Sequence, residues 1–145
     1  MKTSNKGIDL IKKYEGLRLK AYKCPAGVWT IGYGHTGADV AEGLEITEER
    51  ADELLLSDIA QFENHVNSVV ESTIKQNQFD ALVSFAFNLG GLSLKNSTLL
   101  KRVNANPIDP AISDELKRWV NEKGKPLAGL VKRRAEEAEL YFSTT

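Results

Sequence analysis

The segment from Phe79 to Leu89 constrains the fold more than any other part of the chain, because it is apolar on nearly every side of a helix. Its apolar residues are Phe79, Leu82, Val83, Phe85, Ala86, Phe87 and Leu89. Asn77 is the predicted N-cap of this helix, and Gly90 with Gly91 should end it. A helix without a polar face must be covered by other elements, so the sequence predicts a bundle built around it.

Length, charge and cysteine content limit the classes of protein to consider. A chain of 145 residues can form one compact domain, with one or two lobes, but not two independent domains. Its 19 basic and 20 acidic side chains give a net charge of −1, which indicates no overall attraction to nucleic acid or to an anionic membrane. The single cysteine, Cys24, cannot form an intramolecular disulfide. The chain shows no signal peptide and no bilayer-spanning run, so we expect it to stay in the cytosol unless another protein releases it.

Periodicity and turn residues predict the remaining elements. A helix over 4–15 is followed by two strands, over 17–22 and 28–33, joined by a turn at Pro25 to Gly27. Apolar and polar residues alternate in the first strand, so it should be half-buried. Thr47 is the predicted N-cap of a long helix that continues to Val69, and further helices are expected over 98–103, 112–120 and 127–142. The predicted fold class is α+β, mostly helical with a small antiparallel sheet.

Glu15 is a carboxylate at a position where a helix normally places an apolar side chain. It follows Ile8 and Ile11 at helical spacing, so all three should share the buried face. Loss of hydration raises the proton affinity of a carboxyl group unless a cation compensates it. Glu15 is therefore a candidate general acid.

The last helix carries the opposite charge on its apolar face. Arg134 falls on a predicted apolar stripe, while Arg133 points toward its edge. The other members of the stripe are Leu127, Leu130, Val131, Ala138 and Tyr141. A buried guanidinium needs an acceptor, so we predict an ion pair between Arg134 and Glu15. The alternative is that Arg134 extends its charged end to solvent.

Asp58 interrupts the apolar stripe of the long helix. It follows Leu54 by four residues and precedes Phe62 by four, so it should face inward. One interpretation is a satisfied polar group at the boundary between two lobes. A more specific hypothesis pairs Asp58 with His35, as a structural ion pair between sheet and helix.

Two segments resemble the active-site region of phage-type lysozymes, the endolysins of glycoside hydrolase family 24. They are Glu15-Gly-Leu-Arg-Leu-Lys-Ala-Tyr-Lys-Cys24 and Trp29-Thr30-Ile31-Gly32-Tyr33-Gly34-His35. The family pattern of Glu, eight residues, Asp or Cys, five residues and Thr is satisfied by Glu15, Cys24 and Thr30. The resemblance continues through Asn77-Gln-Phe-Asp80, Phe87-Asn-Leu-Gly90, Arg118-Trp119 and Gly129-Leu-Val-Lys-Arg-Arg134.

This resemblance implies a lysozyme-like fold and a muramidase activity. It implies one catalytic domain over 1–145, with an N-terminal lobe over about 13–60 that holds the sheet and a helical C-terminal lobe over about 61–145. The helix over 4–15 should pack with the C-terminal lobe, and a long helix should connect the lobes across an active-site cleft. The implied reaction hydrolyses the β-1,4 bond between N-acetylmuramic acid and N-acetylglucosamine in peptidoglycan, with Glu15 as the general acid.

Cys24 stands where most relatives carry Asp, and its role stays open. It could act as a thiolate whose pKa is lowered by cations such as Lys23, either as a base or as a nucleophile. It could instead be a polar spacer, or the chain could have reduced activity. The resemblance favours a catalytic part for Cys24, with Thr30 helping to position a water. Residues expected to bind the substrate are Phe87, Asn88, Thr36 and Thr98.

Two other functions fit parts of the sequence. Cys24 and His35 could serve a cell-wall peptidase or amidase, although no orienting residue or oxyanion hole is marked. The chain could also be a binding module for peptidoglycan without catalysis. No metal or nucleotide cofactor is implied, since the histidines belong to no ligand cluster and the glycines to no phosphate loop. We expect a monomer that acts on the periplasmic cell wall of the host, after a separate holin-type pore former has opened the inner membrane.

Overall fold

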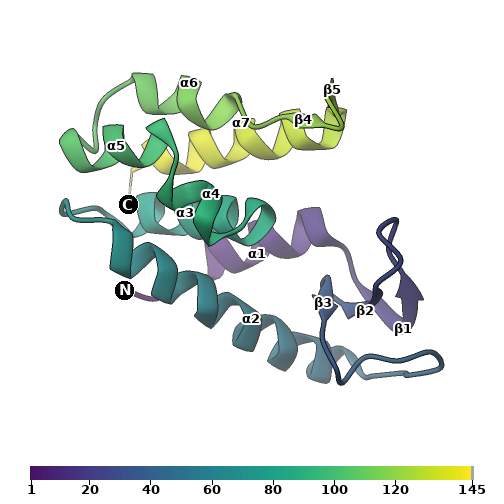
Figure 1. Ribbon diagram of the computed structural model, residues 1–145. Coiled ribbons are helices and arrows are strands. Elements are labelled where there is room, and N and C mark those ends of the chain that lie inside the picture. The colour runs from purple at the N-terminus through teal and green to yellow at the C-terminus, as the bar shows by residue number, and fades with distance from the viewer. Residues whose placement is uncertain (145) are drawn as a thin grey trace.

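Helix α3 (Gln76–Leu89) lies at the centre of the fold, as its apolar sequence predicts. The computed structural model describes residues 1–144. Helices α1 (Asn5–Glu15), α2 (Glu48–Val69) and α7 (Ala128–Phe142) pack against α3 (Figure 1). Every residue from Asn77 to Ala86 is buried. The prediction of a bundle around this segment is confirmed.

The helix termini agree with the sequence in one case and differ in another. Thr47 caps α2 as predicted, because its side-chain oxygen accepts a hydrogen bond from the backbone N–H of Arg50 at 3.1 Å. The predicted cap at Asn77 is wrong. The N-cap of α3 is Lys75, two residues before the predicted one, and the Asn77 amide is buried inside the helix, where it donates to the Ser143 hydroxyl at 2.7 Å. Asn77 therefore fastens the chain's C-terminal segment to α3.

The second half of the chain is helical, as expected, with two additions. The predicted helices are α5 (Thr98–Ala105), α6 (Ala111–Lys117) and α7. A short helix α4 (Gly91–Lys95) and a hairpin of β4 (Asn121–Glu122) and β5 (Lys125–Pro126) were not predicted. Both are too short to produce a periodic pattern in the sequence.

A three-stranded antiparallel sheet precedes α2, with β1 (Arg18–Lys23), β2 (Trp29–Gly32) and β3 (His35–Thr36) in that order. Ile31, Val40 and Leu54 form a small core between the sheet and α2. The prediction that the first strand is half-buried is wrong for Leu17 and Leu19, which are 36% and 43% exposed. The main contacts of α2 with the sheet are made through β2 and β3, so Leu17, just before β1, and Leu19, on this edge strand, lack a covering helix.

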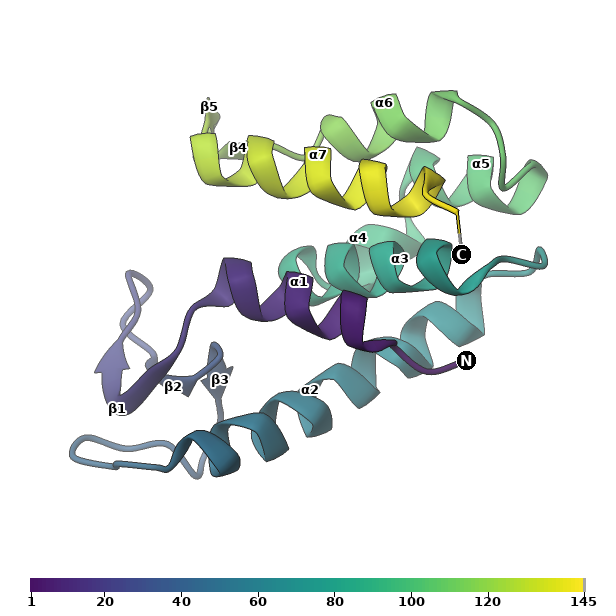
Figure 2. The ribbon, with the colours of Figure 1, turned by 180° about the vertical axis from the view of Figure 1, so that it is seen from behind.

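The order of the elements places the end of α1 at the boundary between helices and sheet. α1 lies beside α3, and its last residue, Glu15, leads through Gly16 into β1 (Figure 2). Gly16 has a φ of 71°, a conformation that glycine adopts without strain. The α+β fold class is confirmed. The division into lobes near residue 60 stays a prediction.

Candidate active site

Glu15 is held in a defined position at the end of α1. Its side chain is 21% exposed, and its Oε2 accepts a hydrogen bond from Arg133 Nη1 at 2.7 Å. On the other side, a Cβ atom at Gly34 would lie only 2.8 Å from Glu15 Oε1. Gly34 has a φ of +77° and follows β2, so a glycine there allows the backbone to approach the carboxylate closely. One oxygen is therefore fixed by a cation and the other faces the sheet.

The prediction that Arg134 pairs with Glu15 is wrong, because the neighbouring Arg133 makes that ion pair. Arg133 is buried rather than at the edge of the helix, at 3% exposure. Its guanidinium also donates to Glu137 Oε2 at 3.3 Å and to the carbonyl oxygen of Ser84 at 3.2 Å. These acceptors belong to α7 and α3, so Glu15 is tied to the helical core through Arg133.

Arg134 is fully buried, so it does not extend to solvent. Its partners among residues 1–144 are other than Glu15, since Nη2 donates to Asn88 Oδ1 at 2.6 Å and Nε lies 2.9 Å from Glu137 Oε1. Glu137, also fully buried, joins the two arginines. Burial raises the pKa of Glu137, and the charges of Arg134 and Arg133 oppose that rise.

Two pockets meet at Glu15. One has a volume of about 260 Å³ and is lined by Glu15, Gly34, Thr36, Asp58, Gln61, Phe62 and Phe87. The other, of about 380 Å³, is lined by Tyr14, Glu15, Asn88, Leu127, Ala128, Gly129, Leu130 and Arg133. Glu15 is the residue that both share, so a ligand that extends across both pockets would pass the carboxylate.

Most of the residues expected to bind substrate line these pockets. Thr36 and Phe87 line the first, and Asn88 lines the second. Thr98 does not join them. It lines a different pocket with Arg102, Glu115, Arg118 and Trp119, which shares no residue with the two at Glu15. Gln61 and Phe62 were missed by the sequence analysis, although their spacing of three and four residues from Asp58 places them on its side of α2.

Cys24 lies at the turn that joins β1 to β2, and Thr30 lies beside it on β2. Thr30 is 4% exposed, and its hydroxyl donates to the carbonyl oxygen of Val28 at 3.0 Å. Hydrogen bonds from the backbone at Val28 and Ala26, with a smaller one from Thr30, lower the pKa of the Cys24 thiol. The pKa of Cys24 is lowered, as expected, but the cause is hydrogen bonding from the turn backbone rather than the charge of Lys23, whose amine lies over the Trp29 ring. Neither residue lines the pockets at Glu15.

His35 and Asp58 form the expected ion pair, with His35 Nδ1 2.8 Å from Asp58 Oδ2. His35 Nε2 lies 3.1 Å from Asp39 Oδ2, so a carboxylate engages each ring nitrogen. Burial alone would lower the pKa of His35, but the hydrogen bonds with Asp58 and Asp39 outweigh it and raise that pKa. The pair joins β3 to α2 and forms part of the wall of the first pocket.

This ion pair predicts a pH-dependent stability. A raised histidine pKa stabilises the fold fully below the unfolded value of about 6.5, and the contribution is lost as pH rises through the folded pKa. The lowered pKa of Asp39 sets the lower end of the pH range in which the ion pair stabilises the fold. The contribution of Asp39 to stability is lost as pH falls below about 3.9, its unfolded pKa, and through its folded pKa. We expect His35→Asn to reduce the free energy of unfolding by about 2 kcal/mol at pH 5 and by much less at pH 9. Urea denaturation measures this difference.

His65→Asn is the matched control, because His65 is an exposed histidine on α2 without an ion pair among residues 1–144. Its effect should be small at both pH values, because no ion pair is lost. An effect of His35→Asn that is equal at pH 5 and pH 9 would contradict the assigned ion pair.

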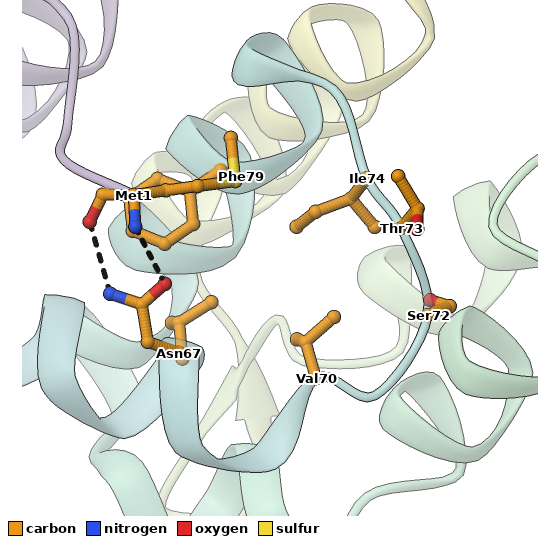
Figure 3. A pocket seen from close by; sticks show the side chains of 8 residues that line it. Met1, Asn67, Val70, Ser72, Thr73, Ile74 and Phe79 are labelled. Atoms are coloured by element: carbon orange, nitrogen blue, oxygen red, sulfur yellow. Dashed lines mark hydrogen bonds between the residues drawn. The ribbon is translucent and has the colours of Figure 1, made fainter.

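A further pocket, of about 200 Å³, lies toward the carboxyl end of α2 and is lined by Met1, Val66, Asn67, Val70, Ser72, Thr73, Ile74 and Phe79 (Figure 3). Asn67 closes it on one side through hydrogen bonds with the Met1 amine and carbonyl groups, at 3.1 and 3.0 Å. None of these lining side chains carries a carboxylate, an imidazole or a thiol. This pocket is therefore a poorer candidate for the reactive site than the pockets at Glu15.

A carboxylic acid between two adjoining pockets, at the junction of a helical bundle and a small sheet, fits a lysozyme-type glycoside hydrolase, in which such an acid protonates the departing sugar oxygen. The sequence pattern of the phage lysozyme family matches residues 12–137. The chain belongs to this family and is a glycoside hydrolase.

Individual relatives are similar to this protein over the whole length of the chain. The endolysin of Acyrthosiphon pisum secondary endosymbiont phage 1 is 47% identical, and the match covers 99% of both chains. The muramidase domain of SpmX from Asticaccaulis excentricus has a TM-score of 0.91 at 41% identity. A mutant of P22 lysozyme has a TM-score of 0.88 at 38% identity, and each match covers 99% of both chains. The chain spans 55% and 57% of the endolysins of Bacillus phages B103 and PZA, so it matches only part of those proteins.

Proposed function

We propose that this protein is an endolysin that hydrolyses the β-1,4 bond between N-acetylmuramic acid and N-acetylglucosamine in bacterial peptidoglycan, with Glu15 as the general acid. The observation that carries the proposal is the position of Glu15 between two pockets that could hold the sugars on either side of the bond. The test is release of new reducing ends from purified peptidoglycan, which Glu15→Gln should abolish.

The two oxygens of Glu15 have different surroundings, and this suggests how the acid works. Oε2 accepts a hydrogen bond from Arg133, so the proton is best carried by Oε1. Protonation of the glycosidic oxygen by Oε1 breaks the bond to the leaving sugar, and positive charge develops on the ring of the other sugar. Arg133 then stabilises the carboxylate that remains until water returns the proton.

Cys24 and Thr30 are proposed to serve the other half of the reaction, in which a water or the thiolate attacks the sugar. The lowered pKa of Cys24 increases the fraction of thiolate, and the Thr30 hydroxyl lies close enough to interact with it. A thiolate base would activate water and invert the anomeric configuration. A thiolate nucleophile would form a thioglycoside, which water then hydrolyses with release of the thiolate, so that the configuration is retained. The anomer of the first product therefore separates these two roles.

We expect Cys24→Ser to lower the rate of reducing-end release by about 10²-fold, because a serine hydroxyl is a much weaker base than a thiolate. Cys24→Asp should retain most of the activity, since a carboxylate can activate water in the same place. The measurement is reducing-end release by each variant, with the anomer identified by NMR. Full activity in Cys24→Ser would contradict a catalytic part and leave Cys24 as a spacer.

The rival hypothesis of a Cys24 and His35 peptidase or amidase is not favoured by the contacts of His35. Both ring nitrogens of His35 are engaged by carboxylates, Asp58 and Asp39, so neither is available to deprotonate the thiol. Alkylation of Cys24 separates the hypotheses. The peptidase hypothesis requires loss of peptide or amide cleavage with intact glycan strands.

The proposal extends to where the protein acts. Full-length similarity to endolysins supports action on the cell wall. Among residues 1–144, no helix combines the length and apolar character needed to cross a bilayer. We place the monomeric protein in the host cytoplasm until a holin-type pore releases it, although SAR-endolysins of bacteriophages PS119 and PS34 are also relatives, at 37% identity. Expression in cells with and without a pore former tests this, because lysis without one would contradict it.

A further inference from the structure

Gln61 is an exposed amide in the wall of the active-site pocket. It lies on α2, three residues after Asp58, and both side chains line the pocket that contains Glu15. Residues at this spacing are neighbours on one helix face, with Cβ atoms about 5–6 Å apart. No group among residues 1–144 forms a hydrogen bond with the Gln61 amide, so it can serve a ligand.

Asp58 provides an acceptor beside this amide. His35 Nδ1 engages Asp58 Oδ2 at 2.8 Å, and no hydrogen bond within residues 1–144 engages Oδ1. The ion pair also fixes the orientation of the Asp58 carboxylate, whose side chain is 20% exposed. One wall of the pocket therefore presents a fixed acceptor and a neighbouring donor.

The pocket also has an aromatic wall. Phe62 and Phe87 line it, and their ring centroids lie 5.3 Å apart at an angle of 59°. Phe62 follows Gln61 directly on α2, whereas Phe87 comes from the end of α3. The two rings provide an apolar surface within reach of the same ligand as the polar pair.

These three features match the chemistry of an acetamido group. In a trans amide the N–H and C=O groups point in opposite directions, so an acceptor and a donor on one helix face can engage both when the amide lies between them. We propose that Asp58 Oδ1 accepts from the N–H and the Gln61 amide donates to the C=O of a sugar acetamido group, while Phe62 and Phe87 contact its methyl group. This inference rests on the proposed function, since it assigns specificity within the same pocket.

Removal of the acetyl group gives the discriminating test. A glucosamine unit lacks the carbonyl that Gln61 would bind, so Gln61 should contribute to binding of acetylated sugars and not of deacetylated ones. The ligands are tetramers of β-1,4-linked N-acetylglucosamine and of β-1,4-linked glucosamine. Both are titrated against Glu15→Gln protein, in which cleavage is suppressed, and the dissociation constants are measured by NMR.

In this background, Gln61→Leu should weaken binding of the acetylated tetramer about fivefold, as expected for one lost hydrogen bond, and leave binding of the glucosamine tetramer within twofold. Asn64→Leu is the matched control, because Asn64 is an exposed amide on α2 that lines neither pocket at Glu15. It should change neither dissociation constant.

The inference is overturned if Gln61→Leu binds the acetylated tetramer as tightly as its background, or if it weakens both tetramers equally. Failure of the proposed function has a different signature. It would appear as absence of reducing-end release by the wild-type protein, whatever the two dissociation constants are.

Discussion

Glu15→Gln should lower reducing-end release from peptidoglycan by at least about 10³-fold, because the amide cannot donate a proton to the departing sugar oxygen. General acid catalysis by a positioned group contributes about 10² to 10⁴-fold, and no other carboxyl group is shared by the two pockets at this site. The measurement is the initial rate of reducing-end formation by the wild-type and variant proteins at equal concentration.

The variant should still fold, so its loss of activity would reflect catalysis rather than stability. The carbonyl oxygen of the substituted amide side chain can accept the hydrogen bond that Arg133 donates to Glu15, so Arg133 keeps a partner. Glu139→Gln is the matched control, since Glu139 is an exposed carboxylate on α7 outside both pockets. It should retain the full rate. An unchanged rate in Glu15→Gln would overturn the assignment of the acid.

The same variant separates an enzyme from a binding module. A muramidase without its acid should still sediment with insoluble peptidoglycan while it fails to clear a cell-wall suspension. A binding module should not clear the suspension in its wild-type form either. If the wild-type protein clears the suspension and Glu15→Gln does not, the protein is not a binding module without catalysis.

Glu137→Ala should reduce the free energy of unfolding by about 3–5 kcal/mol, the second large effect that the structure predicts. Glu137 is fully buried and lies between the guanidinium groups of Arg133 and Arg134. Removal of its carboxylate leaves two buried cations with fewer acceptors, and Ser84 loses the partner of its hydroxyl. Urea denaturation measures the loss.

Glu136→Ala is a close control, because Glu136 is the preceding residue and pairs with Lys13 at the surface. Exposed ion pairs contribute about 0–1 kcal/mol, so this variant should unfold near the wild-type midpoint. Equal effects of the two substitutions would contradict the central role of Glu137. At temperatures where Glu137→Ala stays folded, its reducing-end release should also fall, since Arg133 then holds Glu15 less firmly.

Sequence periodicity predicted Arg134 as the partner of Glu15, whereas the structure has Arg133 in that ion pair. The pattern places Arg134 on an apolar stripe that begins with Leu127 and Val131, but these two side chains are 40% and 46% exposed. The start of α7 is therefore open to solvent, and burial begins with Arg133, where α7 meets α3. Neighbouring residues on a helix differ by about 100° in direction, and both arginines are buried, so the elements that each one faces decide which of them reaches Glu15.

Local sequence was sufficient for several features because their causes lie within a few residues along the chain. The inward direction of Glu15, the buried character of α3 and the capping of α2 by Thr47 follow from helical spacing and capping chemistry. The pair of His35 and Asp58 was also anticipated, from the need of an inward-facing carboxylate for a partner.

Tertiary structure alone decided the contacts between segments that are distant in sequence. It selected Arg133 as the partner of Glu15, placed Gly34 against the carboxylate, directed Thr98 to another pocket and left Leu19 of β1 exposed. Each of these depends on which surfaces meet when helices and sheet pack together. The sequence by itself determined that a buried acid would need a cation, and packing determined which cation reaches it.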